Sequence, residues 1–139
     1  MEIVIPGKPV IGGRARGELL VSDEPLSFWG GYDYHTGEIT DRRHPLSGQV
    51  ATNRILALPF TRGSSTTTAI LLEAVRAGTA PVAILTTGTD TFFALASIVA
   101  KELFDHSLPI IALDPQDFAR LHTGNQAEIE VDGSVHITG

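Results

Sequence analysis

The sequence contains no cysteine among its 139 residues. It therefore has no disulfide, no thiolate nucleophile, no cysteine-ligated zinc and no iron–sulfur cluster held by its own cysteines. No apolar run approaches the roughly 20 residues that span a bilayer. Residues 1–6 include an acid and no base, unlike the basic start of a signal peptide. We therefore expect a cytoplasmic protein with no membrane partner.

Basic residues are also scarce, since 10 Lys and Arg stand against 16 Asp and Glu and give a formal net charge of −6. Nucleic-acid affinity comes largely from Lys and Arg at phosphates, so we expect no nucleic-acid partner. A hydrophobic content of 42% and a charged content of 19% exclude a disordered chain. The length predicts a single domain over residues 1–139 with a substantial core.

The second half of the sequence alternates predicted strands with predicted helices. Short apolar runs predict buried strands, and stretches with apolar residues at helical spacing predict helices between them. This alternation is typical of an α/β domain with right-handed β-α-β crossovers. The predicted strands are residues 54–59, 81–85 and 108–113, and the predicted helices are residues 66–77, 91–103 and 116–121.

Local signals mark several helix ends. Gly78 is a suitable stop for the first helix. Asp90 is most simply the N-cap of the second, and Asp114 followed by Pro115 predicts the start of the third. Residues 91–103 are apolar on nearly every side, which predicts a helix buried in this domain or against another chain.

Extra β structure flanks this α/β core. Short aliphatic runs bounded by Gly or Pro predict two N-terminal strands, and an Asp-Gly turn predicts a C-terminal hairpin. Between them, a long stretch shows no convincing periodicity, and irregular segments of that length are often functional. The strands are residues 2–5 and 18–21, the hairpin is residues 128–131 and 134–137, and the irregular stretch is residues 23–48.

The sequence Arg62-Gly63-Ser64-Ser65-Thr66 connects a predicted strand to the helix that follows it. This junction lies at the carboxyl end of the strand, where open α/β sheets bind ligands. Free amides at the helix start, the serine hydroxyls and close approach at Gly63 suit a carboxylate or phosphate. The alternative is that Ser64 or Ser65 only caps the helix.

Two other clusters lie in the irregular segment. The run Asp41-Arg42-Arg43-His44 offers groups that bind carboxylates or titrate near neutrality, or it is a solvated turn whose charges satisfy one another. The run Phe28-Trp29-Gly30-Gly31-Tyr32 covers a pocket or a partner, or it is ordinary loop packing. The 5 histidines show no pair at metal-binding helical spacing, so we predict no metal ligands.

Taken together, these motifs resemble the small subunit, or swivelling domain, of the aconitase X family. The resemblance rests on Pro25-Leu26-Ser27-Phe28-Trp29-Gly30-Gly31, Thr36-Gly37-Glu38-Ile39-Thr40-Asp41, His44-Pro45-Leu46-Ser47-Gly48 and Arg62-Gly63-Ser64-Ser65. It runs from about Gly13 to the C-terminal hairpin. It implies a swivelling β/β/α domain of the aconitase small-domain type, consistent with the alternation above.

The resemblance also implies a two-part hydro-lyase whose large subunit carries the iron–sulfur cluster or metal, with no cofactor bound by this chain. In aconitases a Gly-Ser-Ser-Arg loop supplies the catalytic base. By that match Ser64 is the predicted base and Ser65 the alternative. Arg62, Gly63, Thr66 and His44 are the predicted substrate-binding residues. Thr66 stands where aconitases have Arg, and Arg62 is the candidate replacement.

The family dehydrates cis-3-hydroxy-L-proline in bacteria and mevalonate 5-phosphate in archaea. Residues 108–114 and 126–129 resemble the bacterial type, so the expected function is hydroxyproline metabolism in a heterodimer or larger assembly. The phosphate substrate stays open because Arg42 and Arg43 are available to bind it. The alternative outside enzymes is a stand-alone module that binds a carboxylate or phosphate at the same helix start.

Overall fold

The structure is a computed structural model that describes residues 2–60, 65–88 and 90–139. Strands and helices follow one another as the apolar patterns predict, with additional short strands in the N-terminal half. The strands are β1 (Ile3–Ile5), β2 (Lys8–Ile11), β3 (Ala15–Val21), β4 (Tyr32–Asp33), β5 (Glu38–Ile39), β6 (Ile55–Ala57), β7 (Ala83–Thr87), β8 (Ile110–Leu113), β9 (Gln126–Ile129) and β10 (Val135–Thr138), and the helices are α1 (Ser65–Ala77), α2 (Thr91–Phe104) and α3 (Pro115–Phe118).

The described residues form an eight-stranded sheet in the order β1-β10-β9-β3-β6-β7-β8-β2. Strands β3, β6, β7 and β8 are parallel to one another, and their carboxyl ends therefore meet at one edge. The remaining strands pair antiparallel on either side of these four. Strands β4 and β5 form a separate two-stranded sheet.

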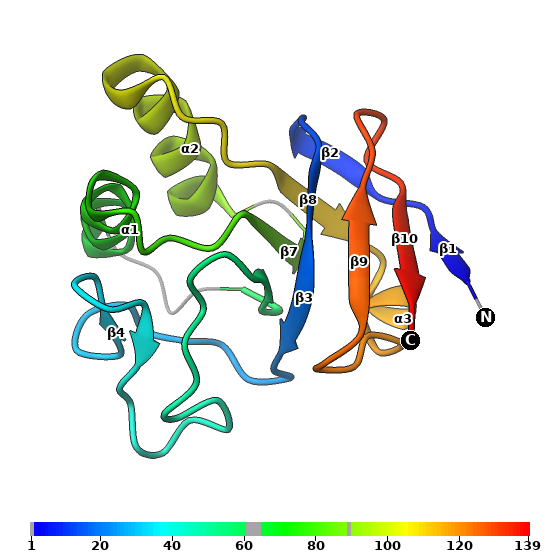
Figure 1. The fold of residues 1–139 in the computed structure, drawn as a ribbon, viewed down its shortest axis with the longest axis horizontal. Coiled ribbons are helices and arrows are strands. Elements are labelled where there is room, and N and C mark those ends of the chain that lie inside the picture. The colour runs from blue at the N-terminus through cyan, green and yellow to red at the C-terminus, as the bar shows by residue number, and fades with distance from the viewer. Residues whose placement is uncertain (1, 61–64, 89) are drawn as a thin grey trace.

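Both faces of the parallel strands are buried, which explains their continuous apolar sequences. Successive residues point to opposite faces, so that Leu20, Leu56 and Ile84 pack in one core and Leu19, Ile55 and Leu85 in the other. The first core lies under α1 and α2, on one side of the sheet (Figure 1). The second lies between the parallel strands, α3 and the side chains of β1, β9 and β10. This β/β/α layering confirms the predicted fold class.

The sequence missed β2, which pairs antiparallel with β8. Its Lys8 and Pro9 interrupt any apolar alternation, and a proline cannot donate to a sheet ladder. The strand is compatible with Pro9 because it lies at the end of the strand order, where one side of its backbone needs no partner, and the register shifts between Pro9 and Ile11.

The stretch predicted to be irregular, residues 23–48, contains β4 and β5 and contributes side chains to the first core. Leu26, Phe28, Ile39 and Leu46 are all buried there. Sequence periodicity could not show this, because the buried residues follow neither a helical nor a strand spacing. The segment lies beside α1 in space (Figure 1).

The structure bears on the predictions for two helices. Within this chain α2 is buried on one side only, through Phe93, Ala96, Ser97 and Ala100, whereas Leu103 is 66% exposed. The predicted helix over residues 116–121 ends at Phe118. The amides of Arg120 and Leu121 bond the carbonyls three residues earlier, which is turn geometry and does not continue an α-helix. None of the helices in the described part of the chain has the length and hydropathy that crossing a bilayer requires.

Candidate active site

The candidate site lies at the carboxyl edge of the parallel strands. Strand β6 leads through Pro59 and Phe60 into residues 61–64, which lie outside the described residues, as do the predicted roles of Arg62, Gly63 and Ser64. The hydroxyls of Thr86 and Thr87 donate to the Pro59 carbonyl at 2.9 and 2.7 Å, and the Thr87 amide donates to it at 3.2 Å. These bonds fix the point from which the predicted active-site loop departs.

The far end of that loop is fixed by the start of α1. The helix begins at Ser65, whose side chain also lies outside the described residues. Thr66 is partly buried, and Thr68 donates its hydroxyl to the Phe92 carbonyl at 3.0 Å, which holds the first turn of α1 against that of α2. No acidic residue lies in the first turn of α1, so its positive end carries no acidic side chain of its own.

The start of α2 carries an acidic N-cap. The Asp90 carboxylate accepts hydrogen bonds from the Phe92 and Phe93 amides at 3.0 and 3.2 Å, as the sequence predicted. A carboxylate in this position satisfies the free amides of the helix end and balances its positive dipole. The two neighbouring helix starts are therefore electrostatically unequal.

His44 lies at the same edge, beyond the end of β3. It is only 7% exposed, and both ring nitrogens have partners within the chain. Nδ1 accepts the Leu46 amide at 3.1 Å, and Nε2 lies 3.2 Å from the Glu24 carbonyl and 3.5 Å from the Ser22 hydroxyl. This pattern assigns the proton to Nε2. His44 thus joins the chain leaving β3 to the turn at residues 41–46, and its predicted contact with substrate stays a prediction.

The arginines beside His44 are exposed. The Arg43 amide donates to the Asp41 carboxylate at 3.0 Å, which makes a local turn. Within residues 2–60, 65–88 and 90–139, neither Arg42 nor Arg43 forms an ion pair, so the alternative of a mutually neutralised charge cluster is not what is observed there. A pocket of about 280 Å³ opens beside this turn, lined by Glu24, Pro25, Ser27, Asp41, Arg43 and His44.

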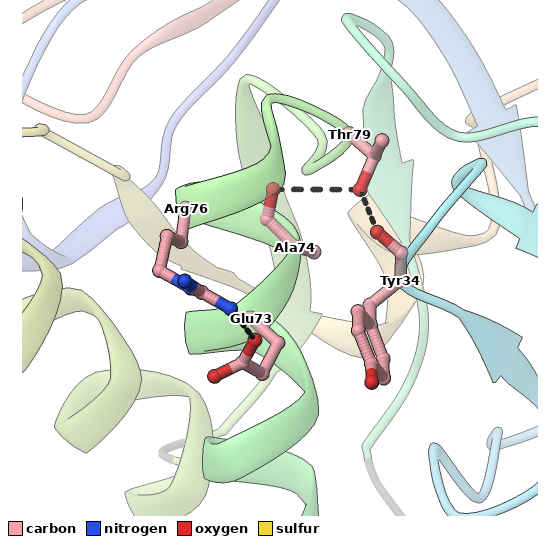
Figure 2. Close-up of polar contacts among 5 residues, drawn as sticks. All are labelled: Tyr34, Glu73, Ala74, Arg76 and Thr79. Atoms are coloured by element: carbon pink, nitrogen blue, oxygen red, sulfur yellow. Dashed lines mark hydrogen bonds and ion pairs between the residues drawn. The ribbon is translucent and has the colours of Figure 1, made fainter.

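Residues 32–34 of the irregular stretch are fastened near the C-terminus of α1. Thr79 donates its hydroxyl to the Tyr34 carbonyl at 2.6 Å and to the Ala74 carbonyl at 3.4 Å, and an adjacent Arg76–Glu73 pair lies on the helix surface (Figure 2). The Tyr32 hydroxyl donates to the Thr79 carbonyl at 3.0 Å. Burial raises the pKa of Tyr32 well above its ordinary value. The irregular stretch therefore leaves β3 at the carboxyl end of the parallel strands and is fastened near the amino end of β7.

The described residues do not offer a metal site. They contain no group of three or more His, Asp or Glu side chains placed to hold an ion. The chain also has no cysteine, so its described residues do not fit an iron–sulfur cluster. Sequence reasoning missed Ser22, Thr86 and Thr87 as residues that organise this edge. Their signal was their position at the end of a buried strand or directly after it.

Comparisons with known proteins agree with this architecture. The sequence pattern of the aconitase X swivel domain matches residues 4–137. Cis-3-hydroxy-L-proline dehydratase of Pseudomonas aeruginosa is 48% identical over 111 residues, which are 80% of this chain and 19% of that protein. The phosphomevalonate dehydratase small subunit of Thermococcus gammatolerans is 36% identical over 132 residues, 94% of this chain and 95% of that one.

A solved structure gives the same result. The crystal structure of Thermococcus kodakaraensis aconitase X in its holo-form superposes with a TM-score of 0.87 at 30% identity, covering 99% of both chains. This chain thus spans about a fifth of the hydroxyproline dehydratase it matches and nearly the whole of the separate small subunits. It belongs to the aconitase X swivel-domain family.

Proposed function

We propose that this chain is the small subunit of a two-part hydro-lyase and is inactive without a large partner. The observation that carries the proposal is its end-to-end alignment with separate dehydratase small subunits, of which it covers 95% in one case. A swivelling domain of this kind closes over a substrate held by a larger body. The start of α1 has no acidic residue in its first turn, and this suits an anionic substrate at the carboxyl edge.

The proposed substrate is cis-3-hydroxy-L-proline, and the proposed product is pyrroline-2-carboxylate. Its support is the higher identity to a protein named for that activity than to the phosphomevalonate dehydratase small subunits. Mevalonate 5-phosphate is the second candidate, and the nearly complete coverage of those small subunits favours it. The exposed Arg43 beside the pocket is a residue that a phosphate group would use.

The dehydration removes the proton on the carbon next to the carboxylate and expels the hydroxyl group from the neighbouring carbon. Removing that proton needs a base at hydrogen-bond reach of the carbon. In the proposed mechanism Ser64 is this base, with Ser65 as the alternative. A serine hydroxyl acts as a base only if its anion is stabilised, and amides at the start of α1 together with Arg62 would supply that stabilisation.

The substrate carboxylate is proposed to bind Gly63, Thr66 and the remaining loop amides. The described residues on either side of the loop are anchored, Pro59 by Thr86 and Thr87 and the first turn of α1 by Thr68. A fixed framework of this kind supports a role in positioning substrate. Since the described residues do not fit a metal or cluster, we assign that group to the partner and assign no step of this chain to it.

The test is a reconstituted complex with the large aconitase X chain of the same organism. The complex should dehydrate cis-3-hydroxy-L-proline faster than mevalonate 5-phosphate, and this chain alone should dehydrate neither. Ser64→Ala should lower kcat by about 10²- to 10⁴-fold while the complex still assembles. Ser65→Ala is the matched control, with a smaller loss expected.

Each contrary outcome has a distinct meaning. Near wild-type turnover in Ser64→Ala would overturn its assignment, and a larger loss in Ser65→Ala would move the role of base to Ser65. Preference for the phosphorylated substrate would replace the first candidate by the second. Ligand binding by the isolated chain without any partner would favour a stand-alone binding module.

A further inference from the structure

The only tryptophan of the chain, Trp29, is 75% exposed. It follows Phe28, which is fully buried, stacks on Tyr32 at a ring-centroid distance of 5.2 Å and meets Phe93 edge-on at 5.9 Å. One aromatic side chain of the pair thus anchors the turn in the core while its neighbour faces outward. This resolves the two alternatives for the cluster: Phe28 is loop packing, and Trp29 is not.

The turn that carries Trp29 is held by its own backbone contacts. The carbonyls of Phe28, Gly30 and Gly31 accept bonds from the Gly31 amide, the Thr40 hydroxyl and the Thr40 amide at 3.3, 3.1 and 3.0 Å. A side chain at position 31 would collide with the Ser27 carbonyl oxygen, so only glycine fits. Such fastening presents a large apolar surface at a small cost in conformational entropy on binding.

Trp29 lies at the edge where the candidate site is. Phe28 packs on Phe93 in the first turn of α2, and Thr68 ties that turn to the start of α1. Ser27 lines the pocket beside His44. Phe60, the last described residue before the predicted active-site loop, is 51% exposed at the same edge. The exposed Trp29 and Phe60 therefore both belong to segments that contact the carboxyl edge.

We infer that Trp29 is an anchor residue of the interface with the large subunit, buried when the carboxyl edge closes over the substrate. This inference rests on the proposed function. The large subunit is the expected partner because a chain that completes a site at the carboxyl edge must approach the edge that bears Trp29. In relatives the same fold exists as a separate small subunit and as a fifth of a longer chain, so a large body accompanies it in both forms. Tryptophan is one of the residue types enriched among the few that contribute most of the binding energy at interfaces.

The experiment uses the uniqueness of Trp29. Incorporating 5-fluorotryptophan into this chain gives a single ¹⁹F resonance, whatever tryptophans the partner contains. Adding the unlabelled large aconitase X chain of the same organism should shift that resonance and protect it from a soluble paramagnetic agent. Adding cis-3-hydroxy-L-proline or mevalonate 5-phosphate to the small chain alone should leave it unchanged.

A variant measures the contribution of the contact. Trp29→Ala should raise the Kd of the two chains at least about 30-fold. Trp29→Phe should recover part of the loss, and turnover by Trp29→Ala should return at saturating small chain. Val131→Ala is the matched control, since Val131 is 59% exposed in the turn between β9 and β10, at the opposite edge of the sheet. Its Kd should stay within about twofold of wild type.

The inference is overturned if the complex forms with an unchanged Trp29 resonance and an unchanged Kd in Trp29→Ala. It is also overturned if assembly is normal and turnover stays lost at saturation, which would place Trp29 against substrate. An assembled complex that shifts the resonance but dehydrates neither substrate would contradict the proposed function alone. Absence of any complex would contradict both.

Discussion

His44 shows how a side chain predicted to bind substrate can have its hydrogen-bonding groups used within the fold. Its imidazole accepts the Leu46 amide through Nδ1 and faces the Glu24 carbonyl through Nε2, and it is nearly fully buried. A neutral imidazole is a donor at one nitrogen and an acceptor at the other, so a single side chain satisfies both groups. The sequence could identify the reactive residue type but could not show these partners, because Glu24 is 20 residues away.

Removing that side chain should weaken the fold. In His44→Ala the Leu46 amide and the Glu24 carbonyl lose their partner, and we expect the free energy of unfolding to fall by about 2–3 kcal/mol. His44→Asn should lose less, because its side-chain oxygen can replace Nδ1 as the acceptor. Urea unfolding at pH 7 measures both, with the exposed His122→Ala as control. Equal stability of His44→Ala and His122→Ala would contradict the structural role.

Among the helices and strands, the sequence predicted the features that depend on neighbouring residues, such as helix caps. Asp90 caps α2 and Asp114 caps α3 as predicted, and Gly78 follows α1 with a positive φ of 78°. The structure of the irregular stretch, residues 23–48, could not be predicted in this way. Their contacts reach far along the chain, as when Tyr32 bonds Thr79, 47 residues away. Sequence spacing carries no record of such contacts.

The burial of the Tyr32 side chain predicts a dependence of stability on alkaline pH. Burial raises the pKa of Tyr32 in the folded chain, whereas the unfolded chain has the ordinary value of about 10. The stabilisation is therefore complete below pH 10. It is lost as pH rises above 10, because the unfolded chain releases the proton first. We expect the free energy of unfolding to fall by up to about 1.4 kcal/mol per pH unit there.

Tyr32→Phe separates this effect from general alkaline unfolding. The variant keeps the ring that stacks on Phe28 but lacks the hydroxyl, so at pH 7 it should be less stable by about 1 kcal/mol. Its stability should fall less steeply between pH 10 and 11.5, so that the two curves converge. Urea unfolding across pH 7 to 11.5 measures the difference. Parallel curves would show that Tyr32 does not carry the alkaline dependence.

For the whole molecule, the sequence predicted the α/β core and the terminal hairpin but not how the layers close on each other. The closure places the connection between β1 and β2 against the turn before β10, where Gly7 and Gly133 approach with backbone atoms in contact. Those segments lie at opposite ends of the sequence. In the sequence each glycine is typical of an ordinary turn, so the sequence alone could not predict that Gly7 and Gly133 approach each other.

This closing contact predicts an asymmetry between two glycines that flank β2. A Cβ at position 7 would collide with the Gly133 carbonyl oxygen and lie 2.5 Å from Ile111 Cγ2, whereas at position 12 the nearest atom is 3.6 Å away. Gly7→Ala should therefore cost about 1–3 kcal/mol through overpacking. Gly12→Ala should stay within about 0.5 kcal/mol of wild type.

Urea unfolding compares the two variants directly, and it also tests what the closure holds together. Ile111 belongs to the core between the parallel strands and β1, β9 and β10, so a side chain at position 7 separates layers and not only a turn. Gly7→Ala should accordingly increase amide hydrogen exchange in β1, β8 and β10 more than in α1 and α2, which cover the other core. Uniform loss of protection through both cores would show that the two layers open as one unit, and unchanged stability would show that the connection yields without cost.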